Sequence, residues 1–209
     1  VSSLTMWHSI FYYFHIGLVV ILFVTLPAGT LLHVLTTPLN GFFSKLEPMR
    51  RLAPVKEDAK HNPIFADRLR NLSWKQLMDV DACTECGRCQ EVCPAYAAGL
   101  DLNPKQLILN IRNAMRRDEK MILHGGTPSI SLVGETITTN VLWACTTCGA
   151  CVKECPAFID HISDVVSMRR YLVNEGEVDD MLQNSLANLG RYGNSFGKSG
   201  RMRAAWAKD

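Results

Sequence analysis

Residues 83–96 read CTECGRCQEVCPAY, and residues 145–158 read CTTCGACVKECPAF. The two stretches align without gaps at an offset of 62 residues and are identical at eight of 14 positions. Both follow the pattern C-x2-C-x2-C-x3-C-P, and together they hold all eight cysteines of the 209-residue chain. The chain therefore contains an internal repeat built around two cysteine runs.

The spacing within each run is typical of 4Fe–4S cluster binding. Three cysteines within seven residues can wrap a loop around one cube of irons, and Gly87 and Gly149 give that loop its dihedral freedom. In bacterial runs of this spacing the fourth cysteine, followed by proline, binds the other cluster. We therefore expect cluster 1 on Cys83, Cys86, Cys89 and Cys155, and cluster 2 on Cys145, Cys148, Cys151 and Cys93.

The first 44 residues contain no charged side chain, although the chain has 22 basic and 20 acidic residues and a net charge of +2. Within them, Ile10 to Leu35 is mostly apolar, and a bilayer core of about 30 Å needs roughly 20 apolar residues in a helix. The run lacks the basic start of a signal peptide. This pattern predicts a membrane span and excludes an ordinary soluble domain, a disordered chain and nucleic-acid binding through bulk basicity.

Basic residues follow the apolar run: Lys45, Arg50, Arg51, Lys56 and Lys60. The positive-inside rule then places the cysteine-containing part on the cytoplasmic side of the membrane. Disulfides are rare in that compartment. Structural zinc normally uses two separated cysteine pairs, so three cysteines in seven residues disfavour a zinc site. Degenerate sites that bind no cluster would not need all eight cysteines, and all eight are present.

Two histidines in the apolar run are spaced as haem ligands. His15 and His33 are 18 residues apart, about five turns of a continuous helix and about 27 Å of rise, so both would point from one face. Histidine in a membrane helix is costly and usually faces a bundle interior or a cofactor. We expect each to bind one b-type haem, with Gly17 allowing close approach and Pro27 kinking the helix. The alternative is two interfacial histidines that contact lipid headgroups.

The stretch with Phe14-His15-Ile16-Gly17, Leu26-Pro27 and Leu31-Leu32-His33 resembles the last transmembrane helix of the nitrate reductase gamma-subunit family of dihaem cytochromes b. The resemblance implies two haem b groups, each with one axial ligand from this chain. In that family the other two ligands come from an earlier helix. They would here come from cytochrome b helices in missing sequence or in another subunit.

The segments around the cysteine runs predict helices. We expect one over residues 64–72, one capped by Asn103 with Leu107, Ile108 and Ile111 buried and Arg112 on its polar face, and one carrying Leu142 and Trp143. Further helices should run from a Ser163 cap to Leu172, stopping near Gly176, and from Val178 to Leu189, ending at Gly190. Pro94 and Pro156 should each start a helix. This is an α-helical ferredoxin domain rather than a β-rich one.

Smaller assignments concern individual side chains. Trp143 should shield a cluster rather than relay electrons, and His61, His124 and His161 are expected in loops. The tail containing Lys198, Arg201, Arg203 and Lys208 is basic and should lead to an absent domain.

The repeat, with Leu142-Trp143-Ala144 before its second copy, resembles an iron–sulfur module. That module is shared by heterodisulfide-reductase-D proteins, anaerobic glycerol-3-phosphate-dehydrogenase-C proteins and membrane-bound electron-transfer-flavoprotein:menaquinone oxidoreductases. In the last group the cytochrome and the module are fused in the order found here. The resemblance implies menaquinone as substrate, electron-transfer flavoprotein as a soluble partner and the cytoplasmic membrane of a prokaryote as location. The family usually continues into CCG domains, so both ends of this chain are expected to be missing or supplied by other chains.

The predicted fold class is all-α, with a transmembrane helix from a dihaem cytochrome b bundle before a two-cluster ferredoxin domain. The expected parts are residues 1–44, a linker over 45–75, the ferredoxin domain over 76–176 and a helix with a basic tail over 177–209. The predicted function is the electron relay of a quinone-linked oxidoreductase. Alternatives are a heterodisulfide-reductase-like or dehydrogenase subunit, and a membrane anchor without haem.

Overall fold

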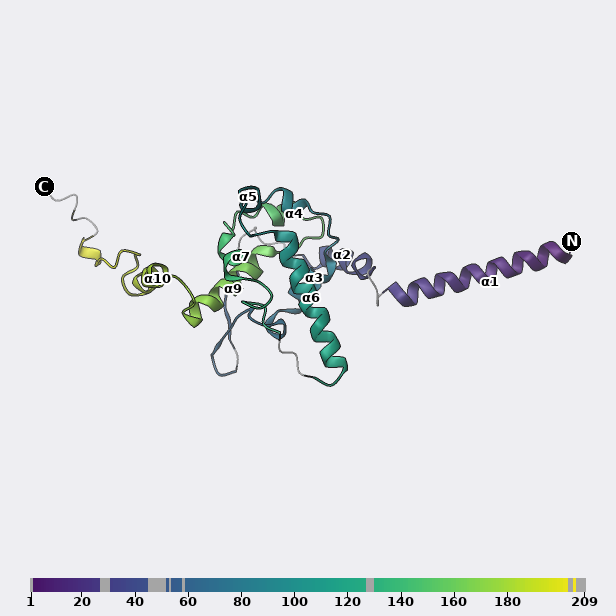
Figure 1. The fold of residues 1–209 in the computed structure, drawn as a ribbon, viewed down its shortest axis with the longest axis horizontal. Helices are drawn as coiled ribbons and strands as arrows, with labels where there is room; N and C mark the ends of the chain where they lie inside the picture. Colours follow the sequence, from purple (N-terminus) through teal and green to yellow (C-terminus); the bar gives the residue numbers. More distant parts are fainter. Residues whose placement is uncertain are drawn as a thin grey trace.

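The computed structural model describes residues 2–26, 31–44, 52, 54–57, 59–126, 130–202 and 205. What the sequence predicts for Pro27, Lys45, Arg50, Arg51, Arg203 and Lys208 lies outside these residues and stays a prediction. Within them the chain is largely helical, with one short antiparallel pair of strands, β1 (Lys56–Glu57) and β2 (Pro63–Ile64). An all-α body with little strand is therefore what the structure shows (Figure 1).

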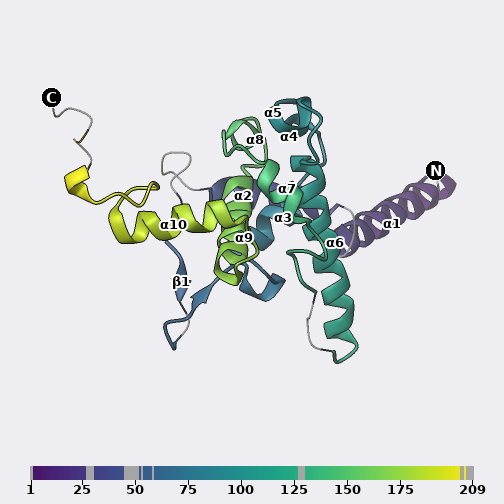
Figure 2. The same ribbon diagram turned by 60° about the vertical axis from the view of Figure 1, so that its left-hand side comes forward.

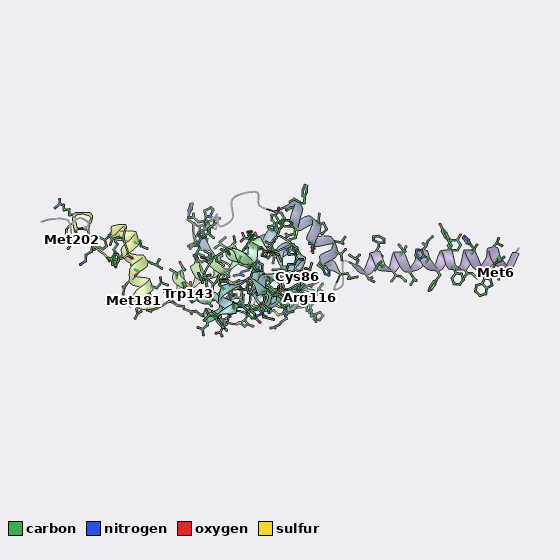
Figure 3. The ribbon with its side chains drawn as sticks, turned by 90° about the horizontal axis from the view of Figure 1, so that it is seen from above. Met6, Cys86, Arg116, Trp143, Met181 and Met202 are labelled. Carbon is green, nitrogen blue, oxygen red and sulfur yellow. The ribbon has the colours of Figure 1, made fainter. Side chains whose placement is uncertain are left out.

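Helix α1 (Ser2–Thr25) stands apart from the body, with its side chains projecting outward along its length (Figures 1 and 3). Among the described residues it is the one helix long and apolar enough to cross a membrane, and none of its span is buried. A second helix, α2 (Leu32–Phe42), follows as a separate element. The single helix expected over Ile10–Leu35 is therefore wrong, and His15 and His33 lie on different helices.

Helix α2 packs on helix α3 (Trp74–Ala82) because its polar side chains meet partners there. The Thr37 hydroxyl donates to the Ala82 carbonyl at 2.9 Å. The Asn40 amide, fully buried, donates to Asp79 Oδ1 at 2.7 Å and to the Ala157 carbonyl at 2.8 Å. These bonds tie α2 to the cysteine-containing body.

The helix expected over residues 64–72 is absent from the structure. Instead β2 is followed by the 3₁₀ turn η2 (Leu69–Asn71). The segment before this turn bonds a distant loop, in which the Leu132 N–H donates to the Asp67 carbonyl at 2.7 Å. The next helix, α3, begins at a Ser73–Gln76 capping box, in which each side chain bonds the other residue's backbone N–H. Between the two, Leu72 and Ser73 are extended, so η2 and α3 are separate elements.

Two long helices enclose the core: α6 (Pro104–Leu123) and α9 (His161–Glu175). As predicted, Asn103 Oδ1 caps α6 by accepting from the Lys105 and Gln106 N–H groups, and Leu107, Ile108 and Ile111 are buried. The body also contains four short helices: α4 (Arg88–Glu91), α5 (Pro94–Ala97), α7 (Thr139–Ala144) and α8 (Ala150–Lys153). Figure 2 shows α4, α5 and α8 near one end of the body, with α7 closer to its middle.

Three helix boundaries differ from expectation. Pro156 begins a turn rather than a helix, because Phe158 has a φ of 58°, which a helix does not allow. Helix α9 is capped by Asp160, whose Oδ1 accepts from the Ser163 N–H at 3.2 Å, so Ser163 is not the cap. Helix α10 (Asp180–Tyr192) continues through Gly190. The predicted stop of α9 at Gly176 is confirmed, and a 3₁₀ turn, η3 (Gly200–Met202), follows α10.

Candidate iron–sulfur sites

Each cysteine run folds into the same loop, followed by one turn of helix. Two residues after the first cysteine, Glu85 and Thr147 have positive φ values of 59° and 53°, which are uncommon for residues with a Cβ atom. Gly87 and Gly149 follow with φ of 84° and 86°, so the predicted glycine conformation is confirmed. The Thr147 N–H donates to Cys145 Sγ at 3.4 Å, and the Glu85 backbone bonds the first cysteine of the other run in the same way. The repeat in the sequence is therefore also a repeat in backbone conformation.

Two cavities, both partly open to solvent, lie against these loops. One spans about 420 Å³, open solvent included, and its lining contains Cys145, Cys148, Cys151 and Cys93. The other spans about 330 Å³, open solvent included, and its lining contains Cys83, Cys86, Cys89 and Cys155. Helices α4 and α8 lie against each other, which brings the last cysteine of each run to the loop of the other run. Each cavity thus gathers three cysteines from one run and one from the other.

The donor set fits a cluster better than a single ion. Among the residues that the structure describes, no three metal-binding side chains converge as they do around one ion. All eight cysteines are free thiols. Four sulfur donors around an open, largely apolar space match a cube that needs one thiolate at each of its irons.

The electrostatics of the thiols agree with such an occupant. Burial raises the pKa of Cys89 to about 11 and that of Cys151 to about 12, and neighbouring cysteines add to both shifts. Burial also raises the pKa of Cys83. Thiolates are therefore unfavourable in these cavities unless positive charge lies among them, which the irons of a cluster supply.

Two arginines hold the beginning of the two runs. Arg112 of α6 donates from Nη1 to the Cys83 carbonyl at 3.2 Å. Arg169 of α9 donates from Nη2 to the Cys145 carbonyl at 2.5 Å, and its Nε and Nη2 also donate to the Leu142 carbonyl. Each arginine therefore fixes the backbone of a run at its first cysteine, from a helix that lies outside the run.

The spacing of the cysteines does not identify these arginines. Arg112 was expected on the polar face of its helix, yet it is only 8% exposed. Each arginine stands nine residues after the residue that caps its helix, Asn103 or Asp160, so the two helices correspond at an offset of 57 rather than 62. Aligning the two helices five residues out of register with the cysteine runs would have paired Arg112 with Arg169 in the sequence.

His161 also departs from expectation. It is not a loop residue but the first residue of α9; it is 4% exposed and lines both cavities. Its Nδ1 lies 3.3 Å from the Ile159 carbonyl oxygen, and burial lowers its pKa to about 4. At neutral pH the imidazole is therefore uncharged and places no charge between the two groups of cysteines.

Trp143 does not line either cavity, and its expected shielding role stays a prediction. The residue is 37% exposed, and the Arg169 guanidinium lies over its ring at 4.9 Å from the ring centroid. This contact and the two carbonyl bonds together hold the Arg169 side chain in place. Among the other histidines, His124 lies in an exposed turn, and exposed His61 bonds Glu57 Oε2 at 3.0 Å.

The candidate haem ligands occupy different surroundings. His15 is exposed on α1, and a Cβ atom at nearby Gly17 would meet no other atom within 4 Å. His33 is half-buried on α2, the helix that packs on the body. Pro27 lies outside the described residues. The structure thus separates the two histidines onto two helices and does not bring them together.

Comparison with known proteins agrees with the cysteine sites. Residues 75–156 match the family described as a 4Fe-4S dicluster domain. The chain is 32% identical over 230 residues to EtfAB:quinone oxidoreductase of Syntrophomonas wolfei, covering 99% of this chain and 32% of the relative. It is 36% identical over 168 residues to a probable membrane-anchored ferredoxin of Chromohalobacter salexigens, covering 70% of this chain and 24% of the relative.

A third relative is the D component of the dihydromethanophenazine:CoB–CoM heterodisulfide reductase of Methanosarcina mazei, 34% identical over 143 residues, covering 66% of this chain and 35% of the relative. The chain spans about a third or less of the length of these relatives. The chain thus combines a segment that matches a 4Fe-4S dicluster domain with a candidate membrane helix, and its relatives are iron–sulfur oxidoreductase or electron-transfer proteins.

Proposed function

We propose that this chain is the electron relay of a membrane-bound, quinone-linked oxidoreductase. The observation that carries the proposal is the pair of four-cysteine cavities within the dicluster domain. Cys83, Cys86, Cys89 and Cys155 hold cluster 1, and Cys145, Cys148, Cys151 and Cys93 hold cluster 2. A bound 4Fe–4S cluster supplies reversible one-electron chemistry. The residues of this chain bury the clusters, hold them side by side and set the charge around them.

The order of the relay follows from the position of α2. Thr37 bonds the carbonyl directly before Cys83, and Asn40 bonds the carbonyl two residues after Cys155, so α2 touches the residues beside two ligands of cluster 1. Figure 3 agrees: along the long axis Cys86 lies nearer to α1 than Trp143, which precedes the second run. Cluster 1 is then the one nearer to the membrane, and cluster 2 faces the soluble partner.

On the membrane side, α1 spans the bilayer and the iron–sulfur domain lies in the cytoplasm of a prokaryote. His15 and His33 each supply one axial ligand to a haem b, beside Gly17 and Pro27, and the second ligands come from cytochrome b helices outside these residues. What supports this for His33 is its place on the helix that is docked beside cluster 1. Menaquinone is the membrane substrate of the complex.

The soluble partner in this proposal is electron-transfer flavoprotein. Its support is the relative that aligns with almost all of this chain, EtfAB:quinone oxidoreductase. A second candidate function is that of an iron–sulfur component of a heterodisulfide-reductase-like enzyme, which the relative from Methanosarcina mazei favours. Co-purification of the complex from its native membrane separates them, since only the first would retain electron-transfer flavoprotein.

Spectroscopy of the purified complex tests the cofactors directly. We expect iron and sulfide for two cubanes per chain, two interacting cubane signals by low-temperature EPR, and a reducible b-type α band in the optical spectrum. Absence of the α band would contradict haem binding and favour the alternative in which the membrane helix only anchors the iron–sulfur domain. Absence of cubane signals in a fully folded chain would contradict the whole proposal.

A further inference from the structure

The two arginines that hold the cysteine runs have unequal surroundings. Arg112 Nη2 pairs with Glu85 Oε1 at 2.5 Å, so its positive charge is opposed by a carboxylate. The position equivalent to Glu85 in the second run is Thr147, and its φ is nearly the same. Among the described residues no carboxylate forms an ion pair with Arg169, which contacts carbonyl oxygens and the face of Trp143 instead.

The difference bears on the reduction potentials of the clusters. One-electron reduction takes a cluster core from the 2+ to the 1+ state, so it adds one negative charge and neither forms nor breaks a bond. A guanidinium bonded to the carbonyl of a ligand cysteine stabilises that added charge, and net charge and hydrogen bonding near a cluster set its potential. A carboxylate paired with the guanidinium offsets this stabilisation of the reduced cluster. Solvent screens part of the carboxylate's charge, because the Glu85 side chain is 56% exposed.

We propose that Arg112 and Arg169 are matched positioning residues that raise the potentials of clusters 1 and 2, and that Glu85 makes their contributions unequal. Arg169 raises the potential of cluster 2 by more than Arg112 raises that of cluster 1. The inference rests on the proposed function in that it needs both clusters to be bound. Lys105 also lines the cavity of cluster 1. It stays constant in every variant below, so the test compares changes in potential rather than absolute values.

Exchanging the two equivalent residues tests the asymmetry. Glu85→Thr should raise the midpoint potential of cluster 1 and leave cluster 2 almost unchanged. Thr147→Glu should place a carboxylate beside Arg169 and lower the midpoint potential of cluster 2 alone. Both potentials are measured on the full chain by redox titration followed by EPR. Glu91→Gln is the matched control: it removes an exposed carboxylate of α4 that forms no ion pair with Arg112, so it should shift cluster 1 by less than Glu85→Gln.

The arginines themselves give a second comparison. Arg169→Gln should lower the potential of cluster 2 by more than Arg112→Gln lowers that of cluster 1, and Arg→Lys at either site should restore much of the loss. A residue that only supported the backbone would change cluster content and not potential. Unchanged potentials in both exchange variants with full iron and sulfide content would overturn this inference. Absence of two cubanes in the unmodified chain would overturn the proposed function instead.

Discussion

The last cysteine of each run lies in the cavity of the other run, and this crossing leads to a test of the ligand sets. If the cavities define the ligands, Cys93→Ala and Cys151→Ala should weaken the same cluster, and Cys155→Ala should resemble Cys89→Ala. The reason is that each cubane loses one thiolate in its own cavity, whichever run supplied it. EPR of each variant, with iron quantitation, shows which cubane signal remains. The ligand sets would be disproved if Cys93→Ala removed the signal that Cys89→Ala removes.

The Asn40 side chain joins α2 to both Asp79 and the segment after Cys155. Burial raises the pKa of Asp79, while bonds from Lys75 and Asn40 oppose that rise. Asn40→Ala removes a donor from a buried carboxylate and a buried carbonyl, which should cost about 1–3 kcal/mol. We expect faster amide hydrogen exchange in α2.

Thr36 and Thr37 provide a matched control for this junction. The Thr37 hydroxyl bonds the body at Ala82, whereas that of Thr36 donates to the Leu32 carbonyl in its own helix. Thr37→Ala should therefore loosen α2 in the same direction as Asn40→Ala, and Thr36→Ala should leave its exchange nearly unchanged. Equal effects of the two threonine variants would show that the interhelical bonds do not hold α2.

The sequence predicts that a glycine ends each of the helices α9 and α10, but only the glycine after α9 does so. Gly176 ends α9 with a φ of 74°, whereas Gly190 lies inside α10 with open space around its missing Cβ. Gly176→Ala should cost about 1 kcal/mol, and Gly190→Ala should stabilise α10 by up to about 1 kcal/mol. Amide exchange within each helix measures both. Destabilisation of α10 by alanine at 190 would mean that this helix ends where the sequence predicts.

The elements that sequence predicts well are those fixed by local chemistry. Asn103-Pro104 starts α6, Gly176 ends α9 and the glycines of the cysteine loops take the expected conformation, because caps and positive φ depend on a few neighbouring residues. The elements that it misses depend on distant partners. Asn40 ties α2 to the body by bonding Asp79 and Ala157, and Arg112 is buried because it reaches Cys83, so neither outcome is visible in helical periodicity.

The whole molecule places its candidate membrane helix at one end of the body and α10 at the other (Figure 1). Exposed aromatic side chains lie where α2 meets α3: the Phe42 and Phe43 rings are 5.0 Å apart, and the Phe43 and Trp74 rings are 5.4 Å apart, between centroids. Phe42 is 80% exposed and Trp74 63% exposed. Tryptophan is enriched at the membrane–water interface, where an amphipathic ring meets headgroups. The side of the body that carries α2 and cluster 1 should therefore rest on the bilayer.

Fluorescence of the full chain in lipid vesicles tests this orientation. The chain has four tryptophans, so one variant keeps only Trp74 and its matched control keeps only Trp143, with phenylalanine at the other three positions. Lipids brominated just below the headgroup should quench Trp74 strongly and Trp143 weakly, because Trp74 packs against Phe43 at the end of α2 whereas Trp143 lies under the Arg169 guanidinium of α9. Phe42→Ser with Phe43→Ser should reduce the quenching of Trp74 if the aromatic contact reaches lipid. Equal quenching of Trp74 and Trp143 would mean that the bilayer does not distinguish the two sides of the body, and the order from membrane to cluster 1 to cluster 2 would lose its structural basis.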